Sequence, residues 1–402
     1  MTEQRRDRIA ELEREVAHLR SELERTASPK VRRLTLGGIR RRARSIGARI
    51  RGRLLGSAGP SGAVGHEGPV ASAVPRFFDN RAATTPPARA ARPDVSVVIP
   101  VFNSAPWLDD CLSSVLAQTG ASLELICVND GSTDASLEIL QRYATSDPRV
   151  TILDQPNSGQ SVARNRGQQA AAGRYLIFLD SDDFWPSDSL ADLVADADSN
   201  ELDVLLFDCF SFRDGAVPEA AWARYAGYYQ RSREYGLTRS GVEMITDMRE
   251  GKDYRPHVGM YLTRTRFLRD TGASFIPGIV HQDNPFTFSL LLDAQRVAHR
   301  QVDVYARRIR PGSTITALRD VDSVKGYLLS FLSMQDELRR AQLPPDQIST
   351  LAQVVYGTFD GALKKFGRLS SDAKDELRRI DESADSQVAF RILSGTEPKR
   401  GR

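Results

Sequence analysis

Between residues 94 and 186, continuous apolar runs alternate with segments in which apolar residues recur at helical spacing. The apolar runs are rich in β-branched residues and cover residues 95–101, 123–128, 150–153 and 175–179. The helical segments between them cover residues 107–118, 135–143 and 161–172. Strands that are apolar along their whole length are buried on both faces, and their alternation with helices is typical of parallel sheets. The pattern therefore predicts an α/β fold with a mostly parallel sheet and helices on both faces.

Helical spacing of apolar residues returns after Asp320. It predicts a helix beginning near that residue, and further helices over residues 344–366 and 371–380. We expect residues 94–318 to form the main domain and residues 319–402 to form a small helical region that packs on it. This region is expected to end in a frayed basic tail.

The first 93 residues differ in texture from the rest. Apolar residues spaced alternately by three and four predict a short amphipathic helix within residues 1–27, suited to a coiled coil and hence to a homo-oligomer. These residues are Ile9, Leu12, Val16, Leu19 and Leu23. Two heptads are too few for a coiled coil that is stable alone, so a solvated or tertiary-packed helix is the alternative. Residues 56–93 are rich in Gly, Ala, Pro and Ser and are predicted to be a flexible linker.

Residues 28–55 form a basic segment. The net charge of the chain is only +3, but its first 60 residues hold 16 Arg and Lys against 7 Asp and Glu. Ile39, Ile46 and Ile50 fall on one stripe of a helix with arginines elsewhere, which suits an anionic membrane surface. A solvated basic arm is the alternative. Nucleic acid is disfavoured as a partner because the segment has no aromatic residue for base stacking.

Composition narrows the class of protein. With 402 residues, 41% hydrophobic and 27% charged, the chain has enough apolar material for a sizeable core, which excludes a wholly disordered or collagenous chain. Three distant cysteines, Cys111, Cys127 and Cys209, give no disulfide framework. No apolar run approaches the roughly 20 residues of a membrane-spanning helix. We expect a cytoplasmic protein, peripheral at the inner face of the membrane if the basic segment binds lipid.

Polar residues cluster where the predicted strands end. Asn103 follows the first strand, Asp130 follows the second, and Asp180, Asp182 and Asp183 follow the fourth. The carboxyl ends of parallel strands meet at one edge of the sheet, where ligands of such folds bind. Oxygen ligands favour Mg²⁺ or Mn²⁺, which share their coordination sites with substrate phosphates. The pattern indicates a nucleoside diphosphate held through a divalent metal.

Four stretches carry a more specific resemblance. They read VSVVIPVFNSAPWLDDCLSSVLAQT, LELICVNDGSTDASLEIL, NSGQSVARNRG and GRYLIFLDSDDFW, and they follow one another between residues 94 and 186. Together they resemble the nucleotide-binding half of family 2 glycosyltransferases, with a weaker likeness to about residue 317. The resemblance implies the GT-A fold and inverting transfer of a sugar from a nucleotide-sugar donor, with a divalent metal at the DxD motif.

The resemblance also implies roles for individual residues. Asp180, Asp182 and Asp183 would hold the metal, and Asp130 would read the base. The residues expected to bind the nucleotide-sugar are Pro100, Val101, Asn103, Asp130, Asn157, Gly159, Arg164, Asp180, Ser181, Asp182, Arg310 and Ser313. Asp283 takes the position of the general base, beside Gln282 where the family usually has Glu. A carboxylate there would accept the proton of the acceptor hydroxyl.

The expected function is transfer of a sugar, with a UDP-sugar as the expected donor, to a cell-envelope glycan, polymer or lipid-linked acceptor. The alternative is a membrane-docked oligomeric adaptor built on a degenerate glycosyltransferase domain. Aromatic residues within 222–235 suit either an acceptor site or core packing.

Overall fold

The computed structural model describes residues 87–185, 188–313 and 320–378, all within one unit, Ser72–Ile380. The predicted coiled-coil helix, the basic segment and residues 56–86 of the predicted linker lie outside the described residues. So does the predicted basic tail. The described residues make up the sheet domain and the helices that come after it.

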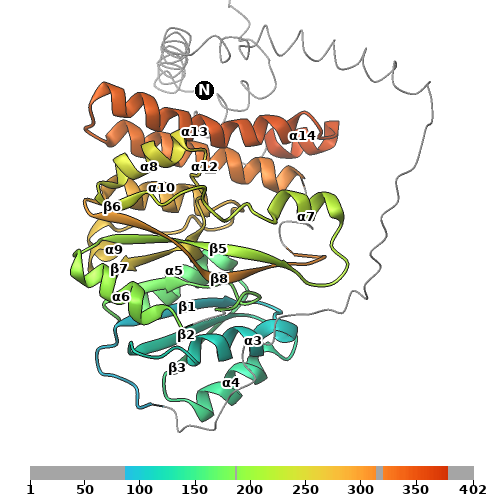
Figure 1. Ribbon diagram of the computed structural model, residues 1–402. Coiled ribbons are helices and arrows are strands. Elements are labelled where there is room, and N and C mark those ends of the chain that lie inside the picture. Colours follow the sequence, from blue (N-terminus) through green and yellow to red (C-terminus); the bar gives the residue numbers. More distant parts are fainter. Residues whose placement is uncertain (1–86, 186–187, 314–319, 379–402) are drawn as a thin grey trace, which may run out of the picture. The chain divides into compact units, whose positions relative to one another are not determined.

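A single mixed sheet forms the centre of the described chain (Figure 1). Its strand order is β3-β2-β1-β4-β7-β5-β8-β6. The strands are β1 Val95–Val101, β2 Leu123–Asp130, β3 Val150–Gln155, β4 Tyr175–Phe178, β5 Val204–Arg213, β6 Gly236–Arg239, β7 Tyr261–Arg264 and β8 Val297–Ile309. Only β7 and β6 pair antiparallel with their neighbours, so the other described strands share one direction. The predicted mostly parallel sheet is confirmed.

The direction of the strands decides which ends meet. Because β8 runs parallel to β5, and β7 lies antiparallel between β5 and β4, the carboxyl end of β8 comes to the same edge as those of β1, β2 and β4. An isolated bridge between Phe184 and Ala306 ties the segment after β4 to β8. Residues near 180 and near 308, far apart in sequence, therefore share this edge.

Helices cover the sheet and extend it. They are α3 Ala105–Leu116, α4 Ser136–Ser146, α5 Gln160–Ala170, α6 Leu190–Ser199, α7 Glu219–Tyr225, α8 Gly241–Glu250, α9 Thr265–Thr271, α10 Asp283–Asp293, α12 Asp320–Arg340, α13 Pro345–Phe366 and α14 Ser371–Arg378. Helix α5 packs on β1 and β2, whereas α12 and α13 pack on each other and on α10 and α8 (Figure 1). The predicted C-terminal helices are confirmed. No helix in the described ranges is long and apolar enough to span a membrane.

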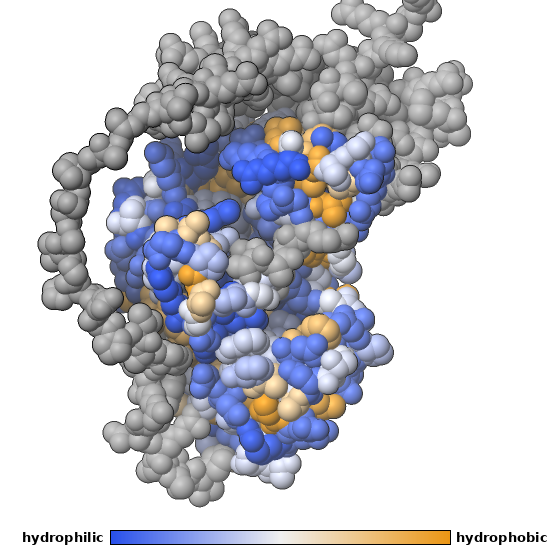
Figure 2. All heavy atoms as spheres, turned by 90° about the vertical axis from the view of Figure 1, so that its right-hand side faces the viewer, coloured by the Kyte–Doolittle hydropathy of each residue, from blue (hydrophilic) through white to orange (hydrophobic). Residues whose placement is uncertain are grey.

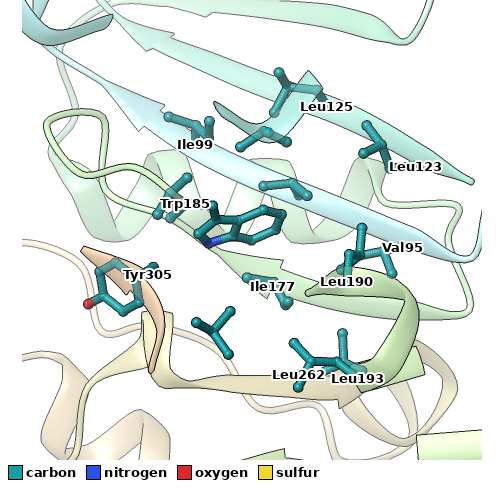
Figure 3. Close-up of a cluster of buried hydrophobic side chains, with 14 of the residues drawn as sticks. Val95, Ile99, Leu123, Leu125, Ile177, Trp185, Leu190, Leu193, Leu262 and Tyr305 are labelled. Carbon is teal, nitrogen blue, oxygen red and sulfur yellow. The ribbon is translucent and has the colours of Figure 1, made fainter. Parts of the chain in front are cut away.

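The core explains why the apolar runs became strands. Side chains of β1, β2 and β4, such as Ile99, Leu125 and Ile177, belong to one buried cluster with the indole of Trp185 (Figure 3). All three cysteines, Cys111, Cys127 and Cys209, are free and buried. Burial raises the pKa of their thiols, so they behave as small apolar core residues.

The face of the molecule drawn in Figure 2 is mostly hydrophilic. On the face drawn in Figure 2, hydrophobic residues form separate patches among hydrophilic ones. Among the described residues, large apolar side chains that stay exposed include Phe102 and Tyr228, at 47% and 41% of their surface. Both line the pocket that contains the predicted site residues.

Candidate active site

A pocket of about 580 Å³ opens at the shared carboxyl edge of the sheet. Twelve of the predicted site residues line it: Pro100, Val101, Asp130, Asn157, Gly159, Arg164, Asp180, Ser181, Asp182, Asp283, Arg310 and Ser313. They come from the ends of β1, β2, β4 and β8 and from the starts of α5 and α10. The tertiary fold thus brings together residues that are more than 200 positions apart.

Asp130, the last residue of β2, organises the loop that follows β3. Its Oδ1 accepts hydrogen bonds from Gln155 Nε2 at 2.7 Å and from the Ser158 amide at 2.8 Å, and its Oδ2 accepts from the Gly159 amide at 2.8 Å. The side chain is almost fully buried. Each carboxylate oxygen can accept more than one hydrogen bond, so this arrangement fixes Asp130 and leaves acceptor capacity for a ligand.

Asn103 is predicted to bind the nucleotide, but it is not among the residues that line the pocket. It has a positive φ of 48°. Its Oδ1 accepts a hydrogen bond from the Thr133 amide at 2.8 Å, and its own amide donates to Ser132 Oγ. In the structure, Asn103 joins the loop after β1 to the loop after β2. Short polar side chains tolerate this left-handed conformation, which explains an Asn at this position.

Asp180 is held by two arginines. Arg164 Nη2 lies 2.6 Å from one carboxylate oxygen, and Arg307 Nη1 lies 3.2 Å from the other. Burial would raise the pKa of Asp180, but the two guanidinium groups outweigh it and hold the pKa well below its usual 3.8. Asp180 is therefore an anion at neutral pH, and Arg164, only 2% exposed, is buried against it.

Asp182 faces the pocket beside Arg310. The guanidinium of Arg310 contacts Asp182 Oδ2 through Nε at 3.1 Å and Nη2 at 3.0 Å. It also lies over the ring of Trp107, 3.7 Å from the ring centre. Asp182 keeps 24% of its side chain exposed. This carboxylate is thus positioned by a cation but still accessible to a ligand.

Asp183 is also predicted to bind metal, but it lies beneath the pocket and does not line it. It is 1% exposed, and its Oδ1 accepts a hydrogen bond from the Arg308 amide at 2.7 Å. Burial raises its pKa well above 3.8. In the structure, Asp183 links the segment after β4 to β8.

Asp283 is the first residue of α10, and its environment suits proton transfer. Burial raises the pKa of its carboxyl group, although Arg164, with Nη1 at 3.7 Å, opposes that shift. In the amide orientation that satisfies its neighbours, Gln282 donates to Ser161 Oγ and accepts from Arg164 Nη1 at 2.8 Å. The neutral Gln282 therefore positions Arg164 without adding a second negative charge beside Asp283.

Comparison with known proteins agrees with this geometry. Residues 96–246 match the model of glycosyl transferase family 2. These residues form a family 2 glycosyltransferase domain. Its relatives include the uncharacterized glycosyltransferases EpsJ of Bacillus subtilis, 31% identical over 55% of this chain and 62% of the relative, and YibD of Escherichia coli, 32% identical over 52% and 60%. The chain thus spans about 60% of the length of these relatives.

The glycosyltransferase domain also resembles solved structures. The structure of S. aureus TarS 1–349 in complex with UDP-GlcNAc has a TM-score of 0.53 and 19% identity, and the match covers 75% of this chain and 91% of that one. At this identity the likeness establishes the fold alone, which is the predicted GT-A fold.

The acids of the glycosyltransferase domain fit a metal that is also held by its substrate. Within residues 87–378, apart from two short undescribed stretches, no three His, Cys, Asp or Glu side chains are grouped as a metal cage. Magnesium and manganese sites of nucleotide enzymes often take one or two carboxylates and complete their coordination with substrate phosphates. The accessible Asp182 fits that arrangement, with Asp180 beside it, whereas the buried Asp183 does not line the pocket.

Sequence reasoning missed several residues of this site. Arg307 contacts Asp180, Asp183 and the buried ring of His257, and Arg308 donates to the carbonyl of Asp182 at 2.7 Å. Both stand in the basic stretch that includes the predicted Arg310 and Ser313. The sequence did not indicate that these two arginines contact the acids after β4. That contact depends on the pairing of β8 with β5 and on the bridge between Phe184 and Ala306, which join segments far apart in the chain.

Proposed function

We propose that the domain transfers a sugar from a nucleotide-diphosphate sugar to a glycan acceptor with inversion at the anomeric carbon. The observation that carries the proposal is the grouping of Asp283, whose pKa is raised, with Asp182 and several arginines in one pocket. The adaptor alternative has no support of this kind, because Asp130, Asp180, Asp182 and Asp283 all line that pocket.

Each part of the site has a task in this reaction. The loop organised by Asp130 binds the nucleoside, and Arg310 binds the diphosphate and stabilises the charge that develops on it as it departs. A divalent cation at Asp182 would supply further neutralisation of that diphosphate. Asp283 accepts the proton of the attacking hydroxyl, and its raised pKa brings its basicity closer to that of a general base at neutral pH.

Finer parts of the proposal draw on relatives. UDP is the proposed nucleotide, since TarS was solved with UDP and UDP-GlcNAc. A cell-envelope acceptor is supported by the relative TuaG of Bacillus subtilis, which is described as a putative teichuronic acid biosynthesis glycosyltransferase. TuaG is 44% identical to this chain over 25% of this chain and 40% of the length of TuaG. We further propose self-association through residues 1–27, contact of residues 28–55 with the inner face of the membrane, and cytoplasmic location.

The test is a panel of nucleotide sugars with Mn²⁺ or Mg²⁺, in which release of the nucleoside diphosphate is followed with and without candidate acceptors. Metal-dependent release from one donor, lost in Asp182→Ala, is the expected result. Calorimetry on the same panel reports donor binding when no acceptor is present. The transferase proposal fails if the full-length protein neither binds nor turns over any nucleotide sugar.

A further inference from the structure

The pocket has a further part, beyond Asp283, whose residues have no role in the proposed donor binding or proton transfer. We call this part the arginine–tyrosine end, and its defining residues are Arg224, Tyr228, His281, Tyr327 and Lys365. The segment before α10 joins it to the rest of the pocket, because Asp283 contacts Arg164 whereas His281, two residues earlier, stacks on Tyr327 with ring centres 3.8 Å apart. An acceptor that approaches Asp283 from this end meets α7, α12 and α13.

Charge divides the two ends of the pocket. The described acidic lining residues, Asp130, Asp180, Asp182 and Asp283, all belong to the nucleotide end or to the base. Among the described residues that line the arginine–tyrosine end, there is no acid. The nucleotide end thus combines carboxylates with cations, whereas the lining residues of the other end include cations and no acid.

The cations at this end differ in how far they are already neutralised. Arg255, which also lines the pocket, lies 3.8 Å from Asp253 and donates to the carbonyl oxygen of Tyr228, and Lys365 pairs with Asp320 at 2.8 Å. Arg224 is exposed, and no carboxylate of the described chain lies within ion-pair distance of it. Arg224 therefore retains its charge for a ligand.

The charges of Arg224 and Lys365 both lower the pKa of His281. Burial together with these two cations lowers the pKa of His281 to about 4, so the ring is neutral at physiological pH. His281 Nε2 lies 2.7 Å from Ser323 Oγ, which fixes the ring against α12. The imidazole is accordingly a neutral surface beside the two cations.

Two tyrosines complete this end of the pocket. Tyr228 leaves 41% of its surface exposed, and the Arg255 guanidinium lies 4.9 Å from its ring centre. Tyr327 is held in place by its stacking on His281. Rigid aromatic rings offer apolar faces and a polar tip at low entropic cost, which suits the faces and hydroxyls of a sugar.

We propose that the arginine–tyrosine end is the acceptor subsite and that it takes a glycan bearing an anionic group, a phosphodiester or a carboxylate, beside the sugar that is glycosylated. Arg224 binds the anion, and Tyr228 and Tyr327 contact the sugar. This inference rests on the proposed transferase function, but it is tested by binding as well as by turnover.

The experiment measures the binding of three probes to the full-length protein, both in the absence of UDP and at saturating UDP. The probes are a poly(glycerol phosphate) oligomer, an oligosaccharide that contains glucuronic acid, and a neutral chito-oligosaccharide. Arg224→Glu reverses the charge, Arg224→Lys keeps it, and Arg266→Gln removes an exposed arginine on α9. We expect one anionic probe to bind, about tenfold weaker in Arg224→Glu, with Arg224→Lys and Arg266→Gln close to the parent protein. The probe that binds distinguishes phosphate from carboxylate.

Three results would overturn the inference: binding of the neutral probe alone, equal binding to Arg224→Glu, or binding of none of the probes. If the protein binds an anionic probe through Arg224 but binds no nucleotide sugar, the anion site is supported and the transferase proposal fails. If transfer is detected, Arg224→Glu should raise the KM for the anionic acceptor and leave the KM for the donor unchanged.

Discussion

Arg164 donates a hydrogen bond to Asp180 with 2.6 Å between Nη2 and Oδ1, and this buried cation also lies 3.7 Å from Asp283. One guanidinium thus connects the DxD motif after β4 to the proposed base on α10. Gln282 accepts from the same guanidinium at 2.8 Å, so Arg164 contacts both carboxylates and the residue that precedes the proposed base.

Arg164→Met should destabilise the protein by about 3 kcal/mol, since it removes the buried cation and leaves the part-buried Asp180 with Arg307 as its remaining partner. Asp180 has a pKa held below 3.8 in the folded state, so its stabilisation is present above pH 3.8 and lost as pH falls through the folded value. The difference in unfolding free energy between parent and variant should therefore be largest near neutral pH and shrink in acid.

Denaturant unfolding at several pH values measures this difference. Arg142→Met is the matched control, because Arg142 and Asp109 form an exposed pair whose side chains are 62% and 54% exposed, and such pairs contribute about 0–1 kcal/mol. Equal destabilisation by the two variants would remove the structural role assigned to Arg164.

Asp283 should control the acidic limb of the rate profile. Burial raises its pKa above 3.8, so the proton-accepting form, and with it kcat, should increase as pH rises through that raised value. Asp283→Asn should abolish transfer and keep donor binding. Steady-state kinetics from about pH 4 to about pH 9 together with donor calorimetry make this test; full turnover in Asp283→Asn would exclude it as the base.

Gly131→Ala should weaken nucleotide binding. Gly131 has φ +71°, and a Cβ there would lie 2.7 Å from the backbone nitrogen of Asn157, in the loop that Asp130 organises. Gly272, with φ +68° and open space around it, is the control, because its replacement by Ala imposes only the left-handed strain of about 1–2 kcal/mol. Both variants should lose stability, and only Gly131→Ala should lose affinity for the nucleoside diphosphate. Equal affinities would contradict this prediction.

Helix α12 should position the base. Gly326 lies so close to the preceding segment that a Cβ would stand 2.3 Å from the Val280 carbonyl oxygen, and Ser323 holds His281. Gly326→Ala should therefore displace the segment that leads into Asp283 and lower kcat by about tenfold or more, in line with the sensitivity of catalysis to small displacements, with donor affinity unchanged.

Gly357→Ala on α13 is the comparison for Gly326→Ala, since no atom lies within 4 Å of its added Cβ. Alanine favours a helix over glycine by about 1 kcal/mol, so this control should be at least as stable as the parent. Comparable kcat in the two variants would show that α12 does not position Asp283.

The sequence by itself determined the first half of the sheet. β1 begins and ends where the apolar run 95–101 predicts, because a strand buried on both faces carries its signal locally. The acids and amides that follow β1, β2 and β4 were bound to meet once those strands were parallel. The same applies to the C-terminal helices, whose amphipathic spacing is also local.

Only the tertiary structure decided which of the acids after β4 is buried and which is accessible to a ligand. Asp180, Asp182 and Asp183 look equivalent in sequence, yet Asp183 is buried under β8, where the Arg308 amide, 125 positions away, fixes it, while Asp182 stays accessible beside Arg310. Asn103 likewise bonds to the next loop instead of lining the pocket. Strand pairing over such separations depends on which segments the closed fold brings together, and no local pattern of side chains encodes it.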